Sequence, residues 1–225
     1  MLSIFKGKKL SSSESVDIIE KIVYETLKPL GFRKHGRTLH RFVDGDISQV
    51  INFQNGCPQK GIYGRLWVNI GIRVPECVER KFHISEPIKS YYHEYECNIR
   101  TCLGFLADGE DTFYDLKKSP QKIAKDIINR IKKHVIPVFD VLNSRESIIQ
   151  HRAEYPSFDQ FANHLILLEE SMIWGRSGNI EKANDLYNKY YNKYYKKSLG
   201  ANPGHLSYLE TLAEQLGIVL EVSYD

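Results

Sequence analysis

Arginine, amide and tryptophan side chains recur on three short segments in which polar and apolar residues alternate. An amide carries both hydrogen-bond donors and acceptors, and the planar guanidinium of arginine matches a carboxylate or a phosphate. An exposed tryptophan beside such groups is a common anchor of protein interfaces. This chemistry is suited to binding, and it identifies no reaction. The candidate binding residues are Arg37, Arg41, Asn52, Gln54, Trp67, Asn69 and Arg73.

The segments that must position these side chains are predicted to be neighbouring strands, over residues 38–43, 46–54 and 63–73. Asp44-Gly45 separates the first two and is typical of a two-residue hairpin turn, because both residues tolerate a positive φ. Such a turn fixes the pairing, and the pairing decides which side chains share a face. One face is predicted to carry Phe42, Ile47, Ile51 and Phe53, and the other Arg37, Arg41, Ser48, Asn52 and Gln54. An antiparallel third strand adds Trp67, Asn69 and Arg73 to the polar face.

A polar sheet face has two interpretations. One side of a meander sheet normally faces water or is covered by another element, and then the polar residues need no function. Alternatively the face binds something. A deep pocket would favour a ligand site or an active site, and an exposed patch would favour a surface that binds another protein.

Segments with helical periodicity precede and follow the predicted strands. Ser11 and Glu14 have the spacing of a capping box, and apolar residues then recur at helical spacing as far as Gly31. A fourth strand is expected over residues 94–105 and a short edge strand over 113–116, and from Ser119 onward the pattern is helical. This order predicts an α+β fold with an N-terminal helix, an antiparallel β-meander of four to five strands, and a helical C-terminal region that contains a helical hairpin.

A break in the pattern near residues 153–156 divides the sequence into an α+β domain, residues 1–153, and a helical C-terminal region, residues 154–225, which is expected to pack on the first. In the second part tyrosines and lysines interleave at helical spacing. Inward packing of the tyrosines explains this pattern, and docking of a partner is the alternative. The candidate secondary surface consists of Tyr187, Lys189, Tyr191 and Lys193.

Composition argues against several classes of function. The 225 residues carry 31 basic and 28 acidic side chains, a net charge of +3 that gives no support for nucleic acid as a partner. No apolar stretch approaches the roughly 20 residues that span a bilayer, so we expect a cytoplasmic protein with no membrane partner. The four cysteines contain no C-x-x-C pair, which favours reduced thiols. The sequence contains no zinc-ligand spacing, phosphate loop, dinucleotide fingerprint or nucleophile elbow, and we therefore expect no metal, no cofactor and no catalytic residues.

Three short motifs are similar to a known family. They are Leu27-Lys28-Pro29-Leu30-Gly31-Phe32-Arg33-Lys34-His35-Gly36-Arg37-Thr38, Val50-Ile51-Asn52-Phe53-Gln54 and Trp67-Val68-Asn69-Ile70-Gly71-Ile72. Together they resemble the uncharacterised bacterial family catalogued as domain of unknown function 4304, over the first half to two thirds of the chain. The resemblance implies a bacterial, intracellular protein and carries no activity, cofactor or site residue.

These observations lead to two functional hypotheses. The first is non-enzymatic protein–protein recognition in the bacterial cytosol, as an adaptor or a toxin-immunity protein. The alternative is an enzyme or a small-ligand-binding protein that uses the polar sheet face. The sequence leaves the partner and the oligomeric state open.

Overall fold

The computed structural model describes residues 10–56, 64–85, 87–158, 165–198 and 203–221. Helix α1 (Ser12–Leu27) begins as the capping box predicts, because the Ser11 hydroxyl accepts from the backbone N–H of Glu14 while the Glu14 carboxylate accepts from that of Ser11. The short helix η1 (Lys28–Leu30) follows and ends at Gly31, whose φ of 85° suits glycine. Apolar side chains of α1 enter the core, which confirms the predicted helix.

Five antiparallel strands form the sheet in the order β1-β2-β3-β4-β5, which confirms the predicted meander. The strands are β1 (Arg33–His35), β2 (Thr38–Val43), β3 (Ile47–Asn55), β4 (Arg65–Arg73) and β5 (Ile99–Cys102). The predicted edge strand is present as β6 (Tyr114–Asp115), which pairs with the start of β4. The outermost strand, β1, has only three residues, and all of them are exposed.

Pairing between β2 and β3 differs from the predicted register by one residue. Val43 pairs with Ile47, so the loop has three residues, Asp44, Gly45 and Asp46, and not two. Asp44 and Gly45 both adopt a positive φ, as the turn signal implied. The faces of β3 are as predicted, but the extra loop residue exchanges the faces of β2. The prediction was therefore wrong for Phe42, which lies on the polar face, and for Arg41, which pairs with Gln49 on the apolar face.

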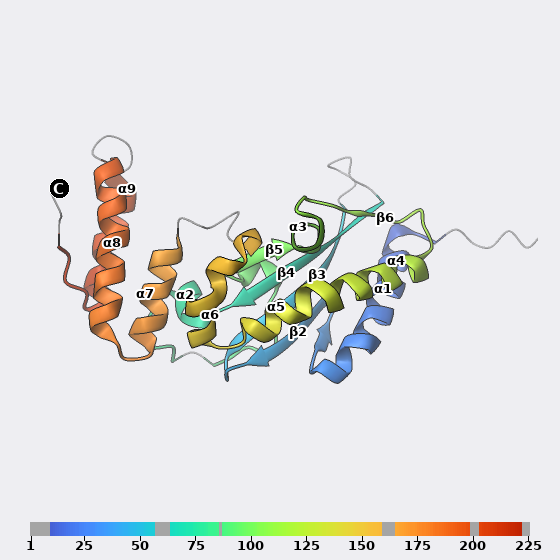
Figure 1. Cartoon of the computed structure of the whole chain (residues 1–225), viewed down its shortest axis with the longest axis horizontal. Helices are drawn as coiled ribbons and strands as arrows, with labels where there is room; N and C mark the ends of the chain where they lie inside the picture. The colour runs from blue at the N-terminus through green and yellow to red at the C-terminus, as the bar shows by residue number, and fades with distance from the viewer. Residues whose placement is uncertain (1–9, 57–63, 86, 159–164, 199–202, 222–225) are drawn as a thin grey trace, which may run out of the picture.

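Helices cover the apolar face of the sheet. In Figure 1, α4 (Pro120–Arg130), the π-helical turn η4 (Ile131–Val135) and α5 (Ile136–Val141) run across it beside α1. The π-turn precedes Pro137, which has no N–H to donate and would crowd a regular helix. Gln49 ties sheet and helix together by donating to the carbonyl oxygens of Phe139 (2.6 Å) and Leu142 (3.2 Å).

Two segments depart from the expected elements. The fourth strand is limited to β5, since residues 94–96 form the short helix η3 (Glu94–Glu96) and α3 (Leu103–Asp108) follows directly. The helical pattern expected from Ser119 onward is interrupted after α5, and α6 (Arg145–His151) begins a new helix with Ser144 as its cap.

The C-terminal helices are α7 (Ile166–Arg176), α8 (Ile180–Ser198) and α9 (Pro203–Leu216). Helices α7 and α8 form the predicted hairpin, with the Ser171 hydroxyl donating to the Ala183 carbonyl oxygen across it. Figure 1 shows α8 and α9 together at one end of the molecule, with α7 between them and the short helix α2 (Pro75–Glu79).

A network of buried and partly exposed charges connects α6 and α7 to the sheet. Its members, which we call the Arg145 network, are Asp44, Asp46, Glu76, Arg145 and Arg176. Arg145 contacts Asp46 at 2.6 Å and Glu76 at 2.7 Å, and Arg176 contacts the second Asp46 oxygen at 2.9 Å. Burial disfavours the charge of Arg145, but the hydrogen bonds that it donates to Glu76 and Asp46 raise its pKa above the ordinary value. Because the Glu76 side chain is fully buried, these ion pairs offset the cost of taking it out of water.

Removing Arg145 tests how much the network stabilises the fold. We expect Arg145→Met to lower the free energy of unfolding by about 3 kcal/mol, since it removes the close ion pair of the fully buried Glu76 and leaves only Arg176, 3.8 Å away, as its cation. Chemical denaturation followed by circular dichroism measures the loss. Lys189→Gln, which removes an exposed pair with Asp185, is the control and should leave the midpoint unchanged. A loss below about 1 kcal/mol for Arg145→Met would contradict this role.

A second prediction concerns pH. Burial, together with the charges of Arg33 and His35, lowers the pKa of His40, a residue on the polar face of β2. Below about pH 6.5 the unfolded chain therefore binds a proton at this site that the folded protein does not, and the free energy of unfolding should fall as the pH drops through that value. His40→Phe should reduce this fall, whereas exposed His83→Gln should not. Equal pH profiles for His40→Phe and the unmodified protein would refute the assignment.

Candidate binding surface

The polar face of the sheet is the one that carries Asn52, Gln54, Trp67 and Asn69, opposite the helices. Residues 91–98 cross part of it. Tyr91 stacks on His35 with ring centroids 3.5 Å apart, and Tyr92 meets Phe42 edge to face. Cys97 and Glu94 lie directly on Gly71, where any Cβ would come within 2.9 Å of the Cys97 side chain. One half of the polar face is thus covered, and the other half is open.

The three predicted arginines lie outside the open half, and each has a structural contact. Arg73 is 5% exposed, with its guanidinium 4.0 Å from the Tyr92 ring centre and paired with Glu79. Arg41 lies on the apolar face because of the register difference, and bonds Gln49 and Asp140. Arg37 follows β1 and donates to Ser13 of α1. The structure places none of them in a shared site.

The amides and the tryptophan do come together. Gln54, Trp67 and Asn69 line a pocket of about 450 Å³ in the open half, which we call hollow 1. The Asn69 amide donates to the Gln54 side-chain oxygen at 2.7 Å, so the two amides hold each other in place. Asn52, which pairs with Asn69 across β3 and β4, is half-buried and donates to the Thr38 hydroxyl at 3.0 Å. The remaining wall of hollow 1 consists of Glu94, Arg100, Thr101, Cys102, Phe105 and Asp111.

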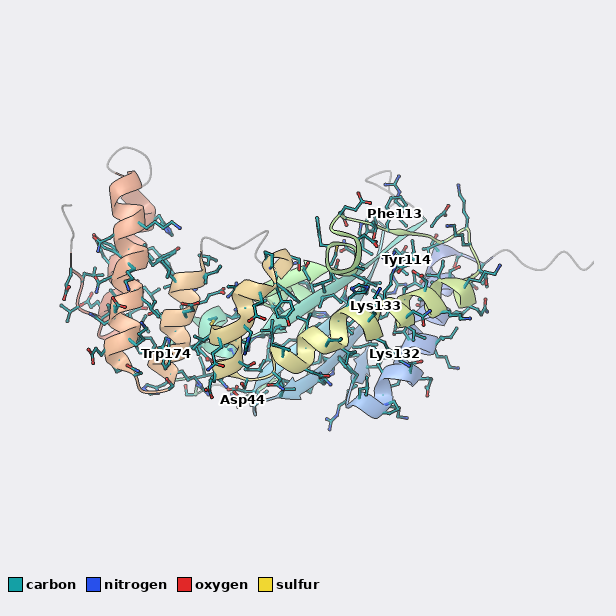
Figure 2. The ribbon with its side chains drawn as sticks, in the orientation of Figure 1. Asp44, Phe113, Tyr114, Lys132, Lys133 and Trp174 are labelled. Atoms are coloured by element: carbon teal, nitrogen blue, oxygen red, sulfur yellow. The ribbon has the colours of Figure 1, made fainter. Side chains whose placement is uncertain are left out.

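Aromatic residues border hollow 1. Phe113 packs against Trp67 with ring centroids 5.6 Å apart, and the Arg65 guanidinium lies 4.3 Å from the Phe113 ring centre. Phe113 is nevertheless 44% exposed. Figure 2 shows Phe113 next to Tyr114 of β6, at the end of the sheet away from α7. An exposed ring held on one side by a neighbour is well suited to contact a partner.

Two further hollows adjoin the first. Hollow 2, of about 300 Å³, shares Arg100 with hollow 1. Hollow 3, of about 530 Å³, shares Tyr95 and Glu96 with hollow 2. Tyr95 is 68% exposed and stands between the second and third hollows. The open part of the polar face is therefore one part of a longer surface. Residues 91–98 extend this surface, because they contribute to the walls of hollows 2 and 3.

Ion pairs fix the charged side chains of this surface. Arg100 donates to Glu94 at 2.6 Å, and this bond raises the pKa of Arg100. Lys89 pairs with Glu96 at 2.8 Å. Burial opposes ionisation of Glu96, but the hydrogen bonds from Lys89 and from the backbone N–H of His93 lower its pKa. These contacts set side-chain positions before any partner binds.

The surface residues that sequence reasoning missed include Glu94, Tyr95, Arg100 and Asp111. Arg100 had a signal, because it is a polar position in an alternating stretch. In the structure Arg100 pairs with Gly71 and so lies on the polar face. Tyr95 had none, since the turn that exposes it belongs to η3, within the stretch expected to be a strand.

The candidate secondary surface on α8 is corrected by the structure. Tyr187 is fully buried and its hydroxyl donates to the Leu209 carbonyl oxygen at 2.6 Å. Tyr191 is also buried and donates to Glu210 of α9. The tyrosines therefore pack α8 against α9, and Lys189 and Lys193 lie on the solvent side. The side chains of Tyr194 and Tyr195 are outside the described residues.

Three cysteines of the described part, Cys77, Cys97 and Cys102, are unpaired and buried. Burial raises the pKa of each thiol, and at Cys102 the Asp111 carboxylate raises it further. A protonated thiol is a poor nucleophile. Within the described ranges, no group of three or more His, Cys, Asp and Glu side chains is placed to hold a metal ion. None of the described helices is long and apolar enough to cross a bilayer.

The Cys102 thiol provides a test of hollow 1. At pH 7.5 we expect Cys102 to react more slowly with iodoacetamide than free cysteine does, because little of it is thiolate. Asp111→Asn should accelerate the reaction, since it removes a charge that raises the pKa. Peptide-resolved mass spectrometry measures the rate, and exposed Glu110→Gln is the control. Faster labelling of Cys102 than of free cysteine would contradict the geometry.

Comparison with known proteins gives one match. No curated protein and no solved structure matches the chain. Residues 23–141, more than half of the chain, match the family described as domain of unknown function (DUF4304). The match begins within α1, includes the whole sheet and ends with α5. It confirms the resemblance seen in the three sequence motifs. The protein belongs to the DUF4304 family.

Proposed function

We propose that this protein is a non-enzymatic recognition protein that binds a segment of another protein along hollows 1, 2 and 3. The observation that carries the proposal is the adjacency of the hollows, which share Arg100 and then Tyr95 and Glu96. A small ligand needs one enclosed pocket, whereas an extended segment can place successive side chains in successive hollows.

The composition of this surface supports the proposal. Its exposed aromatic residues, Tyr95 and Phe113, are of the type that anchors protein interfaces. Its polar side chains are fixed in advance by the pairs Asn69–Gln54, Arg100–Glu94 and Lys89–Glu96. Ordering side chains at an interface opposes binding, so a surface that is already ordered loses less on association.

Within this class, an adaptor or a toxin-neutralising immunity protein in the bacterial cytosol fits best. Both act by holding a partner and not by chemistry on it. The unpaired Cys77, Cys97 and Cys102 of the described residues are consistent with a reducing compartment.

The alternative is a ligand-binding protein or an enzyme that uses hollow 1 alone. Its volume of about 450 Å³ is within the range of small-molecule sites, and Trp67, Asn69 and Gln54 could hold a planar polar ligand. This alternative gives no role to Tyr95 or to hollow 3.

Site-specific photo-crosslinking tests the proposal. A benzophenone amino acid replaces Tyr95 or Phe113 in the native host, and the control position is Tyr208, an exposed tyrosine of α9. We expect one protein to be captured at positions 95 and 113 and not at 208. The purified partner should then bind Tyr95→Ala at least about tenfold more weakly than the unmodified protein.

Other results would contradict the proposal. Equal capture at position 208 would show that the surface is not specific. Thermal stabilisation by a small molecule that is lost in Trp67→Ala but kept in Tyr95→Ala would favour the alternative.

A further inference from the structure

Hollow 2 contains two guanidinium groups whose donors are not all used. Arg80, at the end of α2, has its Nη1 atom buried without a hydrogen-bond partner. Arg100 uses Nε to donate to Glu94, and the structure gives its Nη atoms no protein partner within the described residues. Its side chain is 42% exposed. A buried guanidinium donor without an acceptor is costly, so an acceptor supplied from outside would be favoured.

The charges around hollow 2 leave Arg80 as the cation in excess. Two carboxylates line it, and each already has a counter-ion: Glu96 pairs with Lys89, and Glu169 pairs with Arg152. Arg100 has Glu94. Arg80 has no ion pair within the described ranges. Hollow 2 therefore favours an anion, and the nearby carboxylates favour one with a single negative charge.

The walls of hollow 2 define the rest of the ligand. Val78, Tyr95, Phe158 and Leu165 give it apolar sides, and its volume is about 300 Å³. This space suits a compact apolar group attached to the anion. Arginine binds carboxylates and phosphates through the same planar fork, but a phosphate is close to doubly charged at neutral pH and would be repelled more strongly by Glu96 and Glu169.

We infer that hollow 2 is a carboxylate-binding site, in which Arg80 and Arg100 bind an acidic group of the partner segment while an apolar neighbour fills the hollow. This inference rests on the proposed recognition surface and specifies the chemistry of the partner. The partner places an acidic residue or a chain terminus, next to an apolar group, between hollow 1 and hollow 3.

Phenylacetate is the probe, because it joins a carboxylate to a compact apolar group. Titration is followed by the NMR signals of the arginine Nε–Hε groups at constant ionic strength. We expect a saturable shift of the Arg80 and Arg100 signals and none at Arg33, an exposed arginine of β1. Arg80→Gln and Arg100→Gln should each weaken binding by about tenfold, and Arg33→Gln should have no effect.

Two further probes separate the possible explanations. Phenylacetamide has the same shape without the charge, and binding equal to that of phenylacetate would overturn the inference. Inorganic phosphate should bind more weakly, and tighter binding of phosphate would overturn the assignment to a carboxylate. Misfolding of a variant could also weaken binding. Arg100→Gln controls for this, since Arg100 is partly exposed, and the circular dichroism spectrum of each variant checks its folded state.

The titration and the cross-linking experiment test the two proposals independently. If phenylacetate binds as expected and no partner is captured, hollow 2 is a carboxylate site and the proposed protein partner is wrong. If a partner is captured and phenylacetate does not shift Arg80 or Arg100, the recognition surface holds and the carboxylate assignment is wrong.

Discussion

The fold depends on charge neutralisation at one junction, where Arg145 reaches three carboxylates from two parts of the chain. Asp44 and Asp46 come from the β2–β3 loop, and Glu76 comes from α2 after β4. Arg176 of α7 adds a second cation to Asp46. Burial of Asp46 and Glu76 at this junction would be costly without the arginines, whereas Asp44 is exposed. The Arg145 network therefore fixes where α6 and α7 lie relative to the sheet, and with them the side of hollow 2 that Phe158, Leu165 and Glu169 form.

The same junction explains why the register of β2 against β3 could not be predicted from the sequence. Periodicity identified α1, the strands other than the three-residue β1, and the hairpin of α7 and α8, because each signal lies within one element. The turn residues Asp44-Gly45 were also recognised. The loop length was not, because Asp46 is held in the loop by Arg145 and Arg176, which lie about a hundred residues or more further along the chain. That single residue moved Arg41 to the other face of the sheet.

For the binding surface, the sequence was informative only where a strand carried the side chain. Gln54, Trp67 and Asn69 were predicted to share a face, and they line hollow 1. Tyr95 could not be predicted, since a helical turn replaces the expected strand there, and Arg80 lies at the end of α2, in a stretch to which the sequence assigned no strand. Gly71 is the residue that permits this arrangement. Its missing side chain allows Cys97 and Glu94 to approach β4, so that residues 91–98 can cross the sheet and raise Tyr95 into solvent.

The shortness of β1 has a consequence for how this protein associates with others. An outer strand offers unpaired backbone groups, which can extend a sheet into a second molecule. Here that strand is only Arg33-Lys34-His35, so two molecules meeting edge to edge would gain few backbone bonds and would bring like charges together. Continuous sheets across subunits are thus disfavoured at this side. At this side of the molecule, an assembly has to use side chains on a face of the protein and not the backbone of β1.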